Sequence, residues 1–196
     1  MSEKSAEKFI IRILNKGFQR AAESFSKLIG KDVQISSSPA LLVTPVSEHA
    51  FVSEENGELI VLTTQLMGDI MGKSYLILSE DESKEIFKTV GLQLSDQLKE
   101  GFLLEIDNII SATVIAELSN ELDLEVYGDV PRIFHINARE LQDFMKNSMT
   151  SDEAASIIFS NTNFHFESGD HIHPQFIWRL SSKIFEIIPE GKLKST

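Results

Sequence analysis

The sequence predicts an α/β protein of the α+β type, in which two long pseudo-symmetric helices pack on one face of a mixed, largely antiparallel sheet, with shorter helices around it. The first observation is that two segments, about 7–29 and about 95–121, have the length and the apolar spacing of long helices. The second is that short runs rich in β-formers follow each of them. Because the apolar face of each helix has to be buried against another layer, we expect both helices to lie side by side on one sheet.

The first half begins with the helix over 7–29, which is expected to end at Gly30. The elements predicted after it are extended segments at Val33, Ile35, Leu41 and Val43, turns at Pro39 and Pro45, strands over 59–65 and 74–78, and a turn or bulge at Gly68 and Gly72. A helix over 79–91 closes the half, because Ser79 can cap it and acidic residues fill its first turn.

The second half begins with the helix over 95–121. The elements predicted after it are extended segments over 124–127 and 133–136, a helix over 138–149, strands over 156–159, 164–166 and 175–180, and a last strand over 183–188. Ser168, Gly169 and Asp170 together are typical of a hairpin turn. We expect Trp178 in the core or at an edge contact, and His135 half-buried on a strand.

An internal repeat relates the two halves. The positions that match or nearly match are Asn15 with Asn108, Ser26 with Ser119, Val33 with Val126 and, within one residue, Pro39 with Pro131. Any two amphipathic helices can be aligned, but the matched small residues, the following strand and the proline favour a repeat. We therefore expect residues 1–196 to form a single domain, with halves over about 7–94 and 95–190.

The composition excludes several classes of function. Without cysteine, the chain has no disulfide, no thiolate nucleophile and no cysteine-based metal site. The net charge of −12, with no cluster of lysine and arginine, argues against nucleic acid and against an anionic membrane surface as partners. No apolar run approaches the roughly 20 residues of a membrane span, and the polar N-terminus differs from a signal peptide. We therefore expect a cytoplasmic location.

A helical projection of residues 101–120 separates two faces. The side expected to face the sheet carries Leu103, Ile106, Ile110 and Val114, with Thr113 and Glu117 at its edges. The opposite side carries Gly101, Glu105, Asn108, Ala112 and Ser119, with Ile115 at its margin. Glu105 and Asn108 are spaced i, i+3, so both project from this side about one turn apart. A carboxylate and a carboxamide can attract a cation and exchange hydrogen bonds, so the pair is suited to positioning another group.

The segment from Glu105 onward, EIDNIISATVIAELS, taken with Pro131, resembles the Glu-x-x-Asn helix signature of the CheC/CheX/FliY phosphatases. Members of that family usually carry an acidic residue or a serine four positions before the glutamate, where this chain has Gly101. Asp107 and Ser111 are not at that position and do not replace it. The resemblance extends through the repeat over most of the chain.

The first half resembles the same signature, with Asn15 at the asparagine position and Arg12 at the glutamate position. Because Arg12 would repel a lysine that a glutamate attracts, we expect a degenerate second site there and one working site per chain. The hairpin with Gly68 and Gly72 is also similar to the G-x-x-x-G hairpin of the family.

The resemblance implies a phosphatase that accelerates hydrolysis of the phospho-aspartate on a CheY-like response-regulator receiver. In this interpretation Asn108 orients the attacking water and Glu105 docks the lysine of the receiver. The receiver supplies the Mg²⁺, so we expect no cofactor of the chain's own, and a homodimer is expected by analogy. Two alternatives stay open: a non-catalytic module of the same fold that binds a receiver or a chemotaxis protein, and a polar patch that only keeps the helix soluble. The absence of an acid or serine at Gly101 could also impair the chemistry.

Histidines crowd the segment NFHFESGDHIHP, which contains His165, Asp170, His171 and His173. A metal site needs three or four ligands that converge. Only two of these histidines share one side of a strand, and no further ligand is evident. We therefore expect an exposed polar hairpin here rather than a metal site.

Overall fold

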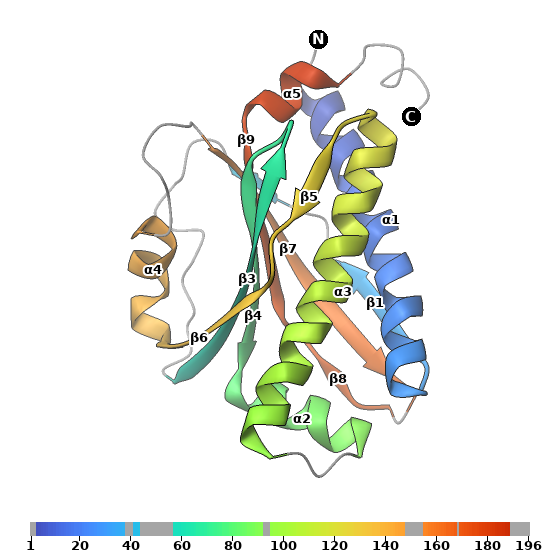
Figure 1. The fold of residues 1–196 in the computed structure, drawn as a ribbon, viewed down its shortest axis with the longest axis vertical. Coiled ribbons are helices and arrows are strands. Elements are labelled where there is room, and N and C mark those ends of the chain that lie inside the picture. The colour runs from blue at the N-terminus through green and yellow to red at the C-terminus, as the bar shows by residue number, and fades with distance from the viewer. Residues whose placement is uncertain are drawn as a thin grey trace.

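The computed structural model describes residues 3–37, 41–43, 57–91, 95–147, 155–167 and 169–188. Figure 1 shows two long helices lying side by side in front of one twisted sheet. The elements are α1 (Glu3–Ile29), β1 (Val33–Ser37), β2 (Leu41–Val43), β3 (Glu58–Gly68), β4 (Gly72–Ser79), α2 (Glu80–Val90), α3 (Asp96–Leu122), β5 (Val126–Gly128), β6 (Arg132–Asn137), the 3-10 turn η1 (Ala138–Glu140), α4 (Leu141–Asn147), β7 (Ala155–Phe166), β8 (His171–Ile172), β9 (Gln175–Ser181) and α5 (Lys183–Ile187).

The strands form one sheet in the order β1-β7-β9-β4-β3-β5, with β2 and β8 also paired to β7 and β6 also paired to β3. Every pairing between described strands is antiparallel. The predicted fold class, two long helices on a largely antiparallel sheet with shorter helices around it, is therefore confirmed.

The two halves exchange their first strands across the sheet. β1 and β2 pair with β7, and β5 and β6 pair with β3, while β4 and β9 join the halves at the centre. Each half thus runs from a long helix to two short strands and then to a pair of longer strands. The internal repeat, with halves over about 7–94 and 95–190, and the treatment of 1–196 as one domain stay predictions.

The main core lies between the helices and the sheet. Large side chains that are fully buried there include Phe9, Phe18, Leu62, Leu66, Phe176 and Trp178. α1 and α3 approach very closely at Gly17, where a Cβ would lie 2.7 Å from Val114 Cγ2. On the other face of the sheet, α4 buries Leu141 and Met145 in a second, smaller cluster. The sheet is therefore covered on both faces at its centre.

The ends of the shorter elements follow the sequence closely. Ser79 caps α2 in a capping box with Glu82, and Gly91 ends this helix with a left-handed backbone. Gly68 ends β3 with a φ of 107°, and a Cβ there would lie 2.0 Å from the carbonyl oxygen of Glu125. These positions confirm the predicted cap and the predicted turn.

Two predicted elements differ from the structure. The segment predicted as a strand over 183–188 forms α5, because Ile184 and Ile188, at i, i+4 spacing, are both buried in the core. The strands predicted over 156–159 and 164–166 are parts of the single strand β7. The polar residues between them did not end the strand, since the hydroxyl of the buried Thr162 donates to Pro174 O at 2.7 Å.

Pro39, Pro45, Ser168 and the last part of the helix predicted over 138–149 lie outside the described residues. Among the helices that the structure describes, none combines the length with the apolar character that a bilayer crossing needs.

Candidate functional site

Glu105 and Asn108 lie on the side of α3 that faces away from the sheet, and both side chains are exposed. The opposite side packs on the core through the four residues that the projection places there, Leu103, Ile106, Ile110 and Val114. The helical spacing therefore predicts correctly which side of the helix carries the candidate pair.

The pair lines a shallow hollow of about 320 Å³ between α3 and the turn that joins β5 to β6. Its lining residues are Gly101, Leu104, Glu105, Asn108, Gly128, Asp129, Val130 and Pro131. The structure thus brings together the glutamate, the asparagine and the proline on which the resemblance rests. Val130, which is 76% exposed, stands at the rim of the hollow.

Two glycines lie in the lining of the hollow, and their surroundings differ. A Cβ at Gly101 would have no neighbouring atom within 4 Å, so the space beside this residue is open. A Cβ at Gly128 would lie 3.0 Å from Ile115 Cδ1 and 3.0 Å from Thr64 Cγ2, so a side chain there would have to displace one or both of these neighbours. Ile115, predicted at the margin of the outer side, is instead buried beneath this turn.

The turn that forms the second wall is anchored to β3. Asp129 N donates to Gln65 O at 2.8 Å, and Val130 N donates to the carboxylate of Asp129 at 2.8 Å. Farther along, His135 on β6 lies 3.2 Å from a carboxylate oxygen of Glu100 on α3. His135 is exposed rather than half-buried as predicted, because β6 presents this side of its edge to α3 and to solvent.

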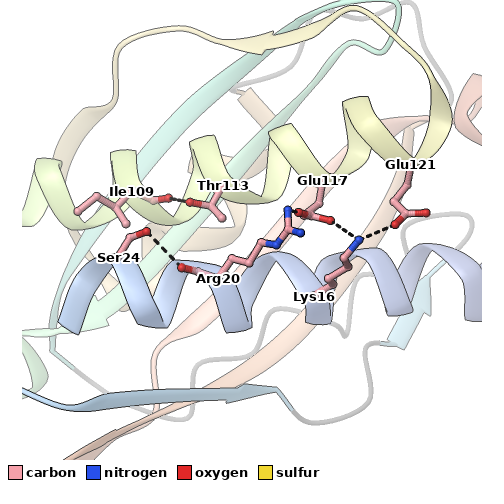
Figure 2. A network of polar contacts seen from close by, with 7 residues as sticks. All are labelled: Lys16, Arg20, Ser24, Ile109, Thr113, Glu117 and Glu121. Carbon is pink, nitrogen blue, oxygen red and sulfur yellow. Dashed lines mark hydrogen bonds and ion pairs between the residues drawn. The ribbon is translucent and has the colours of Figure 1, made fainter. Parts of the chain in front are cut away.

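Glu117, predicted at the edge of the side facing the sheet, turns toward α1 instead. Its side chain is 1% exposed, and its carboxylate lies 3.0 Å from Lys16 Nζ and contacts the guanidinium of Arg20. Lys16 Nζ also contacts Glu121 at 2.7 Å, so one lysine bridges two acids of α3. Figure 2 shows these ion pairs crossing the gap between the two helices. The network fixes the position of α1 along α3.

Asp107, which does not replace the missing acid or serine at Gly101, is a buried acid. It lies between the exposed pair, yet its side chain is fully buried against β3. Thr64 Oγ1 donates to Asp107 Oδ2 at 2.8 Å. Burial raises the pKa of Asp107 to about 7, and the hydrogen bond from Thr64 opposes this rise only in part. The sequence pattern indicates that Asp107 is buried, because Leu103, Asp107 and Ser111 form an i, i+4 series on the buried side of the helix.

The corresponding surface of α1 carries different chemistry. Arg12 is exposed, and its guanidinium lies 4.9 Å from the ring centroid of Phe9, within reach of a cation–π contact. Asn15 is half-buried, and Lys8 and Gln19 are exposed. The turn around Pro39, which would form the second wall of an equivalent hollow, lies outside the described residues.

The three histidines near β8 are exposed. The ring of His171 lies 6.2 Å from that of His165 and 5.3 Å from that of His173, centroid to centroid, and His173 is hydrogen-bonded to Asn163. Within the described part of the chain, no group of three or more histidine, aspartate or glutamate side chains is arranged to hold a metal ion.

Solved structures with the same fold include a FliY, chemotaxis proteins and FliM middle domains. The FliY of Thermotoga maritima matches with a TM-score of 0.68 at 15% identity, over 100% of this chain and 96% of that chain. The chemotaxis protein CheX of Desulfovibrio desulfuricans matches with a TM-score of 0.57 at 15% identity, over 86% and 99% of the two chains. A chain of a FliG–FliM complex from H. pylori matches with a TM-score of 0.62 at 10% identity, over 94% of this chain and 98% of that chain.

No protein-family model and no curated protein sequence matches the chain. The likeness therefore concerns the fold, which is that of the CheC/CheX/FliY-like proteins, as the resemblance in sequence implies. The same fold also occurs in FliM middle domains.

Proposed function

Because the chain has the CheC/CheX/FliY-like fold, we propose that it is a protein phosphatase that accelerates hydrolysis of the phospho-aspartate on a CheY-like receiver. The observation that carries the proposal is that Glu105 and Asn108 are both exposed and both line the hollow closed by Gly128–Pro131. Both groups are therefore accessible to the active site of a receiver at the same time.

In the proposed mechanism Asn108 enters the active site of the receiver and holds a water in line with the phosphorus. Phosphoryl transfer passes through a loose transition state, so placement of the attacking water accounts for much of the acceleration. A carboxamide can accept and donate hydrogen bonds without a change of protonation state.

Glu105 is proposed to pair with the lysine of the receiver and so to set the docking position. One turn of α3 separates it from Asn108, so the ion pair would fix both the rotation and the depth of the amide. The receiver would contribute the Mg²⁺ and the phospho-aspartate, and this chain would contribute no cofactor. We place the protein in the cytoplasm, and a homodimer is part of the proposal.

The test uses a CheY-type receiver phosphorylated with acetyl phosphate, and follows phosphate release with and without this protein. We expect faster release with the wild-type chain and loss of the acceleration with Asn108→Ala. Equal acceleration by Asn108→Ala would refute the assigned role.

A second candidate is a binding module without catalysis. FliM middle domains share the fold, and their structures include complexes named FliG–FliM and FliM–SpeE. The glycine at position 101 removes a polar group that phosphatases of the resembled family usually carry. Receiver binding without any acceleration of phosphate release would favour this candidate.

A further inference from the structure

A buried polar cluster lies directly beneath the hollow. It consists of Asp107 and Ser111 on α3 and Thr64 on β3, and all three side chains are buried. Asp107 is two residues after Glu105 and one residue before Asn108, so it shares their turn of helix but points to the opposite side. The cluster is therefore the nearest polar link between the candidate pair and the sheet.

Thr64 connects the two walls of the hollow. Its hydroxyl donates to Asp107 Oδ2 at 2.8 Å and lies 3.3 Å from Ser111 Oγ. Its methyl group lies 3.0 Å from the position of a Cβ on Gly128. One threonine thus bonds to the helix that carries the pair and lies next to the turn that faces it.

The cluster also reaches the backbone of the candidate pair. Ser111 Oγ lies 3.4 Å from the carbonyl oxygen of Asn108, to which it donates. The other wall is held in parallel, because Gln65, the neighbour of Thr64, accepts the backbone N–H of Asp129. The distance between Asn108 and the Gly128–Pro131 turn is therefore set by adjacent residues of one strand.

Hydrophobic residues alone would fill this position without fixing a rotation of the helix. The cluster is costly, because Asp107 Oδ1 has no hydrogen-bond partner in the described part of the chain. The cluster restrains the helix, because the directional hydrogen bond from Thr64 limits both the rotation of α3 and its distance from β3.

We propose that Asp107 is a positioning residue, which through Thr64 holds the Glu105–Asn108 turn of α3 at a fixed distance from the Gly128–Pro131 wall. This inference rests on the proposed phosphatase function for its catalytic consequence, but its structural part stands apart from that function. Asp107 itself is fully buried, so any effect on a bound receiver acts through the residues around it.

The protonation state of Asp107 provides a signature. Burial raises its pKa to about 7, and no charged side chain of the described residues contributes to the shift. Its polar neighbours are Thr64 on β3 and Ser111 on its own helix, both neutral. Ionisation of Asp107 places a charge in a buried site that offers it one hydrogen bond. The turn of α3 that carries Glu105 and Asn108 should therefore loosen as the pH rises through this pKa.

The catalytic arm of the test measures the acceleration of phosphate release relative to the receiver alone, at saturating phosphorylated receiver, from about pH 6 to about pH 8.5. We expect the acceleration by the wild type to fall as the pH rises through about 7, and the profile of Asp107→Asn to lose this step. Asp123→Asn, at the exposed end of the same helix, should keep the wild-type profile. A step in Asp107→Asn like that of the wild type would overturn the inference.

A second pair of variants separates positioning from general packing. Thr64→Val keeps the shape and removes the hydroxyl, and Thr64→Ser keeps the hydroxyl. We expect Thr64→Val to lower turnover about tenfold or more while the Kd for the receiver changes little, and Thr64→Ser to restore most of the turnover. Turnover at the wild-type level in a folded Thr64→Val protein contradicts the proposal.

An NMR measurement tests the positioning role of Asp107 separately from the phosphatase activity. The side-chain amide of Asn108 and the backbone amides of Glu105 and Gly128 are followed by NMR over the same pH range. We expect a shared titration step near pH 7 in the wild type that is absent in Asp107→Asn. No acceleration by the wild type, with this step present, refutes the phosphatase and leaves the positioning device intact. The absence of the step in the wild type refutes the positioning device whatever the activity.

Discussion

Gly17 on α1 faces Val114 on α3 so closely that a Cβ on Gly17 would lie 2.7 Å from Val114 Cγ2 and 2.8 Å from Val114 Cα. The second of these atoms belongs to the backbone, so a change of side-chain rotamer cannot relieve the contact. The two helices therefore meet backbone to backbone at this point, and the ion pairs of Lys16 and Arg20 with Glu117 lie beside it.

Gly17→Ala should therefore destabilise the protein although alanine is the better helix former. We expect a loss of about 1–3 kcal/mol in the free energy of unfolding, because the helices must separate to admit the methyl group. Gly101→Ala is the matched control, since a Cβ there meets no atom within 4 Å. The control should gain about 0.5–1 kcal/mol. Urea denaturation of both variants tests this, and equal effects would show that the contact carries no strain.

The network around Glu117 predicts an asymmetry between its acid and its bases. Glu117 is buried, whereas the side chains of Lys16 and Arg20 are 43% and 55% exposed. Lys16→Met with Arg20→Met leaves a buried carboxylate without a cation, and we expect a loss of about 2 kcal/mol after allowance for solvent screening. Adding Glu117→Gln to this pair should recover part of the loss.

The control for this prediction is Lys99→Met, which removes an exposed pair with Asp96 and should leave the stability nearly unchanged. Thermal unfolding at low and high salt measures all four proteins. A triple variant no more stable than the double one would show that the stranded charge is not the cause.

Asp107 makes the stability of the protein depend on pH. The unfolded chain ionises this carboxyl near its ordinary pKa of 3.8, whereas the folded chain keeps the proton until about pH 7. Between these values the folded state binds more protons, so the contribution of Asp107 to the free energy of unfolding falls as the pH rises, and it stays level above about pH 7.

Asp107→Asn removes this titration. Relative to the wild type, the variant should become more stable as the pH rises from 4 to 8, by an amount of the order of 4 kcal/mol at most. Urea denaturation at several pH values gives the difference directly. A difference that is the same at low and at high pH would mean that the folded state does not hold the proton of Asp107.

The candidate pair should separate binding from chemistry. Asn108→Ala is expected to keep receiver affinity while turnover falls about tenfold or more, because only the placement of water is lost. Glu105→Ala should weaken both, since it removes the docking ion pair. Asn120→Ala, an exposed asparagine farther along α3, serves as the control. Titration of receiver binding beside the phosphate-release assay measures the two quantities, and a loss of affinity in Asn108→Ala would contradict the division of roles.

The outer side of α3 could be predicted because a helix repeats its direction every 3.6 residues whatever it packs against. The orientation of Glu117 could not, since it depends on where α1 crosses α3, and nothing in the local pattern encodes that crossing. The burial of Asp107 follows from the helical spacing, but its hydrogen-bond partner Thr64 does not, because Thr64 lies 43 residues earlier on β3. The segment over 183–188 is predicted as a strand, whereas the burial of Ile184 and Ile188 in the core, at i, i+4 spacing, favours a helix.

β1 and β2 of the first half pair with β7 of the second half, and β5 and β6 of the second half pair with β3 of the first. Neither half can therefore form its complete set of strand pairs alone. A protein made of one half would have to form a homodimer in which the two copies exchange their first strands. The present chain resembles such an intertwined pair joined end to end. In such a pair, one half can lose a functional site while its strands still complete the sheet. Here α1 carries Arg12 at the position where α3 carries Glu105.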